Sequence, residues 1–239
     1  MNLFLRVFLI CIVNILSVNM LFSQDSLSLQ KITNATLEQY HNSLKAASPI
    51  YNGKLYVPFP HRFSNQNHNY FLSRQLSKGA INYNGISYRS VNIAYDIVKD
   101  ELILLHLDNY SKLVLHPEKV NSFFLLGHTF INIRKDSADL GLPSEGYYDV
   151  LHKGKINLLC KRKKVIKEIT AADKNEKDIR EINRYYLFNG SEYILLTTKK
   201  SLLKALNNPN SQQFIKSTNL NFRKNKEDFI INLVKFSDK

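Results

Sequence analysis

Apolar and polar residues alternate with a period of two through the middle of the chain, which is the pattern of β-strands. The alternation runs over residues 81–83, is interrupted by Asn84-Gly85, and resumes over residues 86–97. Asn-Gly supplies the positive φ angles of a two-residue turn, so we expect a tight hairpin here. Residues 102–105 are all apolar, which indicates a central strand covered on both faces.

Further strands are expected as far as residue 197, in two groups separated by a loop at residues 135–144. Residues 170–181 are polar and highly charged, so we predict a loop or a short exposed helix between the two hairpins of the second group. The remaining predicted strands span residues 112–115, 120–126, 129–133, 147–151, 156–160, 185–188 and 193–197.

The pattern changes to helical spacing after residue 199. Leucines repeat on one helix face up to Leu206, residues 207–210 break the helix, and Ser211 is expected to cap a second one. The last segment, residues 226–236, carries an apolar stripe opposite Lys and Asp. We expect this stripe to pack on the sheet, and the alternative is a helix that lies on a membrane surface.

The N-terminus has the layout of a secretory signal. Arg6 is the only charged side chain in the first 24 residues, residues 3–22 are mostly apolar, and Ser23 is a small residue before a polar run. We therefore expect cleavage after Ser23, which leaves Gln24 as the mature N-terminus. An uncleaved membrane anchor is the alternative, because the apolar stretch nearly reaches the ~20 residues that span a bilayer.

These patterns together predict a mainly β (α+β) fold. It consists of antiparallel β-meander and hairpin units, with short C-terminal helices packed on the sheet. The expected organisation is a signal peptide over residues 1–23, a polar segment that can form one short helix over 24–50, a first β unit over 51–135, a second β unit over 136–198 and a helical segment over 199–239.

The chain resembles small exported β-rich proteins of Bacteroidota in several runs. These runs are Leu-Phe-Ser-Gln at residues 21–24, the stretch from Gly85 to Leu104, Gly141 to Leu151, and Lys200 to Leu206. The resemblance covers most of the mature chain. It implies export and a β-rich fold, and it carries over no functional residue.

No motif in the chain specifies a reaction, a metal or a cofactor. Cys160 precedes two basic residues that would lower the pKa of an exposed thiol, but it follows two leucines in a predicted strand, so we expect a buried core residue. His61 and His68 share one loop and could meet at a metal, although solvated loop histidines are the simpler interpretation. Ser201-Leu-Leu-Lys204 matches Ser-x-x-Lys without its companion motifs.

Charge is the most distinctive property of the sequence. The 239 residues include 33 Lys and Arg against 20 Asp and Glu, a formal net charge of +13. The basic residues concentrate in what we call the basic cluster, a candidate anion-binding surface. The alternative is that these lysines protect an exposed strand from edge-to-edge aggregation. The basic cluster comprises Lys153, Lys155, Lys161, Arg162, Lys163, Lys164 and Lys167.

The leading functional hypothesis is an exported, non-catalytic protein of the cell envelope, periplasmic or associated with the outer membrane, that works by binding or assembly. The excess positive charge favours an anionic envelope component, a lipid headgroup or an acidic glycan, or else another envelope protein. Nucleic acid is not expected, because export separates the chain from it and no aromatic stacking pattern accompanies the basic residues. The alternatives are an envelope hydrolase with a site assembled from distant loops, and an accessory subunit of an outer-membrane complex.

Export predicts a specific mature N-terminus. Protein purified from the envelope fraction of the producing cell should begin at Gln24, because the signal peptidase cuts after Ser23. Intact-mass measurement and N-terminal sequencing would test this. Full-length protein in the cytosol with Met1 attached would contradict the prediction.

Overall fold

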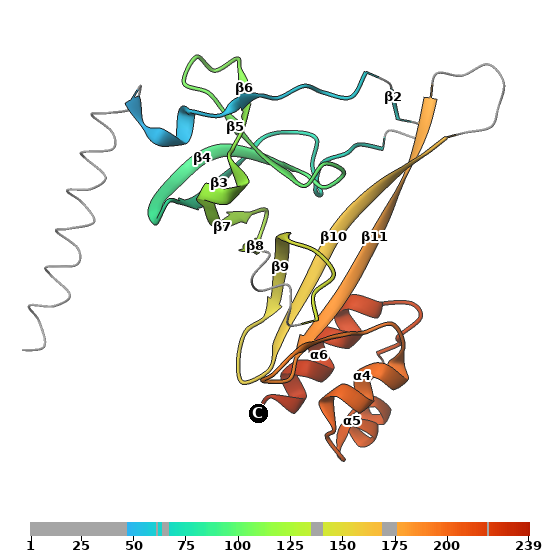
Figure 1. Cartoon of the computed structure of the whole chain (residues 1–239). Helices are drawn as coiled ribbons and strands as arrows, with labels where there is room; N and C mark the ends of the chain where they lie inside the picture. The colour runs from blue at the N-terminus through green and yellow to red at the C-terminus, as the bar shows by residue number, and fades with distance from the viewer. Residues whose placement is uncertain (1–46, 61, 64–66, 135–140, 169–175, 219) are drawn as a thin grey trace, which may run out of the picture. The chain divides into compact units, whose positions relative to one another are not determined.

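The described part of the chain is a single, mainly antiparallel sheet followed by three helices (Figure 1). The computed structural model describes residues 47–60, 62–63, 67–134, 141–168, 176–218 and 220–239. The signal segment and the short helix expected at residues 34–41 lie outside these residues. The strands are β1 (Lys54–Leu55), β2 (Arg62–Phe63), β3 (Ser77–Tyr83), β4 (Ile86–Asp96), β5 (Glu101–Leu105), β6 (Lys112–Val114), β7 (Val120–Leu125), β8 (His128–Ile133), β9 (Gly146–His152), β10 (Asn157–Glu168), β11 (Glu176–Phe188) and β12 (Tyr193–Leu195).

The strand order is β1-β6-β5-β4-β3-β7-β8-β9-β10-β11-β12, and β2 pairs with β11 outside this path. All of these pairs are antiparallel except β2 with β11. β8 pairs with β9, so the two expected β units belong to one sheet. The helices that follow are α4 (Lys199–Leu206), α5 (Ser211–Ser217) and α6 (Lys226–Ser237). The predicted fold class, mainly β with short C-terminal helices, is confirmed.

The residues of the Asn84-Gly85 turn determine the geometry of the first hairpin. Asn84 and Gly85 have φ angles of 52° and 80°, and they connect β3 to β4. Both residue types tolerate this left-handed conformation, in which the turn matches the twist of the two strands. The hairpin predicted from Asn-Gly is therefore confirmed.

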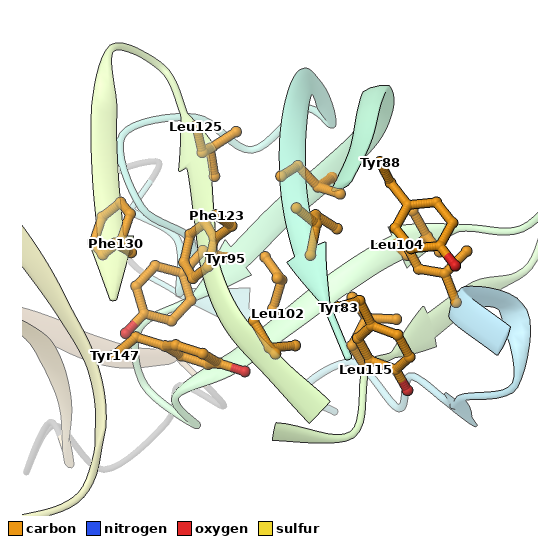
Figure 2. Close-up of a cluster of buried hydrophobic side chains, with 14 of the residues drawn as sticks. Tyr83, Tyr88, Tyr95, Leu102, Leu104, Leu115, Phe123, Leu125, Phe130 and Tyr147 are labelled. Atoms are coloured by element: carbon orange, nitrogen blue, oxygen red, sulfur yellow. The ribbon is translucent and has the colours of Figure 1, made fainter. Parts of the chain in front are cut away.

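The largest core cluster combines aromatic and aliphatic side chains (Figure 2). Tyr95, Phe123, Phe130 and Tyr147 come from four different strands, and their ring centroids lie 4.7–5.6 Å apart in the contacts among them. Most of these pairs meet edge to face, which is a favourable arrangement of aromatic quadrupoles. Since β4 and β7–β9 contribute to the same cluster, the sheet curves around it.

The apolar strand β5 is covered on both faces, as predicted. Leu102 and Leu104 belong to the largest core cluster, whereas Ile103 packs with Tyr56 and Ala94 on the opposite face. Adjacent residues of a strand point to opposite faces, so an unbroken apolar run requires two covering layers.

The charged stretch at residues 170–181 differs from its prediction. Residues 176–181 belong to strand β11, and its partner β10 continues to Glu168 instead of ending at Cys160. Opposite charges face each other across the two strands, with Lys164 opposite Glu181 and Lys167 opposite Asp178. Such cross-strand pairs stabilise a polar hairpin that single-strand patterns do not reveal. Residues 170–175 lie outside the described part.

Helix α4 begins as predicted, and α5 begins one residue earlier than predicted. Thr198 and Ser201 form a capping box on α4, in which each side chain accepts a hydrogen bond from the other residue's backbone N–H. The N-cap position of α5 is Asn210, and Ser211 is the buried first residue of that helix, so its predicted capping role is wrong. The side chain of Asn208 accepts a hydrogen bond from the Asn210 N–H and fixes this earlier start.

The apolar stripe of α6 packs against the sheet, as predicted. Phe229, Ile230 and Leu233 are at most 1% exposed and lie in one cluster with Tyr185 and Leu187 of β11. The stripe is therefore covered by protein, and the alternative of a membrane-surface helix is wrong. Within the described ranges, no helix combines the length and the apolar composition needed to cross a bilayer.

Burial of this stripe should dominate the stability of the C-terminal segment. Phe229→Ala removes a 1% exposed side chain and should lower the free energy of unfolding by about 3–5 kcal/mol in chemical denaturation. The matched control, Tyr110→Ala, truncates a side chain that is 90% exposed and should change it by less than about 0.5 kcal/mol. Equal effects of the two substitutions would contradict the packing of α6 on the sheet.

Candidate functional site

Strand alternation divides the basic cluster into separate environments. On β10, Lys161 and Lys163 point to one face of the sheet, and Arg162 and Lys164 point to the other. Lys153 and Lys155 are exposed in the turn before β10, and Lys167 is exposed further along the strand. The seven residues therefore do not form one continuous surface.

Arg162 lies in a buried polar network on the helix-covered face. Its guanidinium is only 6% exposed. Nε and Nη2 donate to Asp149 Oδ2 at 2.9 and 2.7 Å, and Nη1 and Nη2 donate to the two carboxylate oxygens of Glu227 at 2.6 and 2.8 Å. Tyr185 Oη also donates to Glu227, at 2.9 Å, and His128 Nδ1 lies 2.8 Å from Asp149 Oδ2. We call these five residues the Arg162 network.

The Arg162 network joins helix α6 to the sheet through charge. Asp149 is on β9, Arg162 on β10, and Glu227 in the first turn of α6. Burial alone would raise the pKa of Glu227, but the hydrogen bonds and charge of Arg162, with the Tyr185 hydroxyl, outweigh it and lower that pKa. A buried guanidinium requires this degree of pairing, since removing one partner leaves an uncompensated charge.

Cys160 belongs to the core beside this network. It is fully buried and packs in the same cluster as the α6 stripe. Burial raises the pKa of its thiol, in spite of the opposing effect of the Arg162 charge. The structural role expected for Cys160 is therefore confirmed, because a reactive cysteine needs an exposed thiolate.

Lys164 also has a structural role, because its ammonium is bonded within the protein. Its ammonium donates to the backbone carbonyls of His68 and Tyr70, each at 2.8 Å. Burial lowers the pKa of Lys164, although Glu181 and Asp96 oppose the effect. This side chain holds the segment that precedes β3 against β10, so its charge is not directed to solvent.

The opposite face of β10 and β11 borders a cavity of about 500 Å³, which we call the basic hollow. Its walls come from four segments that are distant in sequence: the turn at 97–100, residues 143–145, β10 and β11. β9 pairs with β10 only as far as Cys160, and beyond it the backbone N–H of Lys164 donates to Ile97 O at 3.0 Å. The turn at 97–100 therefore lies against the part of β10 that β9 leaves uncovered.

Positive charge predominates in the basic hollow. Lys161 and Arg184 are direct cross-strand partners, and Lys163 lies two residues along β10 on the same face. Like charges directly opposite each other destabilise a strand pair unless something compensates for them. Lys161 has such compensation, because its ammonium donates to Asp100 Oδ2 at 2.6 Å. In the part of the chain that the structure describes, Lys163 and Arg184 form no ion pair, and both are exposed.

The pair of Lys161 and Asp100 depends on a glycine. Gly146 has a φ angle of 112°, and a Cβ atom there would lie 2.0 Å from Asp100 Oδ2 and 2.6 Å from Lys161 Nζ. Tyr95 Oη donates to the other carboxylate oxygen of Asp100. Asp100 is thus held from two sides, and its charge is directed to Lys161.

The other sequence candidates do not converge on a site. His61 lies outside the described residues, and His68 is partly buried beside the ring of Tyr70. Ser201 is engaged in the capping box of α4, which accounts for its hydrogen bonds without catalysis. Within the described ranges, no group of three or more His, Cys, Asp or Glu side chains could hold a metal ion.

Sequence reasoning missed two cations of the basic hollow. Lys99 comes from a predicted turn, and Arg184 lies just before the strand predicted at 185–188. Neither is near the basic cluster in sequence, and only strand pairing brings Arg184 opposite Lys161. Strand alternation was the one available signal, because it separates Lys161 and Lys163 from Arg162 and Lys164.

Comparisons with protein-family models, curated proteins and solved structures find no match to this chain.

The lowered pKa of Glu227 predicts how stability depends on pH. The ionised form stabilises the fold fully above the unfolded-state pKa of about 4.3, and this contribution is lost as the pH falls through the lower folded-state pKa. Glu227→Gln should therefore lower the free energy of unfolding by about 2 kcal/mol at pH 7, with a smaller difference from wild type near pH 3.

Urea denaturation across this pH range would measure the effect. Glu192→Gln, which changes an exposed carboxylate, should follow wild type at every pH. A Glu227→Gln difference that is independent of pH would contradict the charge pairing with Arg162.

Proposed function

We propose that this chain is an exported, non-catalytic binding protein of the cell envelope that holds an anionic component through the basic surface of β10 and β11. The observation that carries the proposal is the pair of exposed, uncompensated cations, Lys163 and Arg184, at the wall of the basic hollow. Lys161, their neighbour on the same face, is compensated by Asp100. Exposed cations gathered beside a hollow attract anions without prior conformational change.

The signal-like N-terminus supports the envelope location. Export would place the chain among phospholipid headgroups and acidic glycans, whose negative charge complements its formal net charge of +13. Protection of an exposed strand edge is the competing interpretation of the lysines, because β10 extends beyond its partner β9.

Local charge, rather than net charge, should control binding. Substituting four exposed lysines of the basic cluster, Lys153, Lys155, Lys163 and Lys167, with Gln should weaken binding by at least about tenfold. The matched control replaces four exposed lysines of the C-terminal helices with Gln, so the net charge falls equally. Its positions are Lys200, Lys204, Lys216 and Lys235.

Two probes suit this comparison: phosphatidylcholine vesicles that contain phosphatidylglycerol, in co-sedimentation, and immobilised polygalacturonate, in salt elution. Equal losses in the two variants would show that net charge alone drives binding and would contradict the proposal. Analytical ultracentrifugation distinguishes anion binding from the competing interpretation that the lysines protect a strand edge. That interpretation predicts that the cluster variant self-associates and still binds anions.

A further inference from the structure

The charges that border the basic hollow do not cancel. Lys99, Lys161, Lys163 and Arg184 line it together with two carboxylates, Asp100 and Glu145. The lining therefore has a formal excess of two positive charges. Arg162 borders the hollow as well, but its charge is paired with two carboxylates on the other face of the sheet.

Two of these cations, Lys163 and Arg184, have a charge that no carboxylate of the described residues pairs with and that is open to the hollow. Lys163 is exposed, and Arg184 is exposed beside the hydroxyl of Tyr186. Lys99 borders the hollow, but its ammonium is engaged elsewhere: it donates to the backbone carbonyl of Val57 at 2.6 Å and lies 4.9 and 4.7 Å from the ring centroids of Tyr56 and Phe59. The fourth cation, Lys161, is paired with Asp100 through its ammonium.

The arrangement of the donors favours a tetrahedral oxyanion. Lys163 and Arg184 are diagonal neighbours on adjacent strands, so an ammonium and a planar guanidinium reach the hollow from two positions. A phosphate has three terminal oxygens that accept hydrogen bonds from different directions, whereas a carboxylate has two in one plane. A phosphate monoester carries about −1.5 to −2 charges at pH 7, which complements the two uncompensated cations, Lys163 and Arg184.

The rest of the lining indicates what the phosphate is attached to. The partly buried apolar residues Val165 and Ile182 border the same hollow. A volume of about 500 Å³ lies in the range of small-molecule sites and is large enough for a phosphate with a group of sugar size. The walls at 97–100 and 143–145 make the site concave, so a single headgroup or sugar can enter.

We propose that the basic hollow binds the phosphate monoester group of a small ligand, with Arg184 and Lys163 as its principal contacts. This inference rests on the proposed function, because it names the chemical class of the anion and the part of the basic surface that binds it. The phosphate can belong to a soluble sugar phosphate or to a lipid headgroup, and the probes below distinguish these sources.

Isothermal titration with glucose 1-phosphate tests the inference directly. The double variant Lys163→Gln/Arg184→Gln should bind it at least about tenfold more weakly than wild type. The matched control is Lys153→Gln/Lys155→Gln, which removes two charges of the basic cluster from the turn before β10, outside the lining of the hollow, and should bind like wild type. Arg184→Lys should show an intermediate loss, because it keeps the charge and removes the planar donor fork.

Two further probes define the ligand class and its source. Glucuronate, a sugar carboxylate, should bind at least about tenfold more weakly than glucose 1-phosphate, because it carries one negative charge and two acceptor oxygens. Phosphatidylcholine vesicles with phosphatidic acid present the same monoester on a lipid, and competition between them and glucose 1-phosphate would place both in the hollow. Stronger binding to the vesicles than to the sugar phosphate would assign a lipid source.

The outcomes of these experiments distinguish failure of phosphate binding in the hollow from failure of the proposed envelope function. All of the substituted side chains are exposed, so unchanged circular dichroism should accompany the loss of binding. Equal affinity of the two double variants, tight binding of glucuronate, or no binding of phosphate monoesters by wild type would overturn the inference. After any of these results, the proposed function would still hold if the four-lysine cluster variant lost vesicle or polygalacturonate binding. If that variant bound both probes like wild type, the proposed function would be contradicted as well.

Discussion

The Arg162 guanidinium lies buried between Asp149 and Glu227, and this placement sets the direction in which the neighbouring side chains of β10 point. A shift of β10 by one residue would move Arg162 to the opposite face and bury Lys161 or Lys163 against the helices. Such a shift would leave charges unpaired in the core, at a cost of several kcal/mol. Burial of Arg162 therefore fixes the register of the strand as well as the position of α6.

The basic hollow follows from that register. With Arg162 on the helix-covered face, Lys161 and Lys163 must lie on the other, where β11 contributes Arg184. The pair of Lys161 and Asp100, which Gly146 makes sterically possible, reduces the repulsion between Lys161 and Arg184. What remains is an excess of positive charge that the chain does not neutralise, and in folded proteins such an excess is more useful to a ligand than to stability.

Local signals in the sequence were sufficient for much of the fold. Asn84-Gly85 specified its hairpin, residues 102–105 specified a strand covered on both faces, and the apolar stripe of α6 specified the packing of that helix. The length of the β10–β11 hairpin could not be predicted, because its distal half depends on charged residues that pair across two strands.

The candidate site was only partly predictable for the same reason. The basic cluster included Lys161 and Lys163, but it also included Arg162 and Lys164, which the structure uses to hold elements together. Arg184 belongs to the site only through its pairing with Lys161. A run of basic residues in a sequence therefore combines structural and exposed charges, and strand alternation is the first test that separates them.

Chemical-shift mapping of the ¹⁵N-labelled protein during titration with glucose 1-phosphate would test whether the face of β10 opposite Arg162 binds anions. We expect shifts in the backbone amides of residues 97–100, 161–165 and 182–186, with the amides of residues 153–155 and of α4 unchanged. Shifts confined to residues 153–155 or to the C-terminal helices would contradict this expectation.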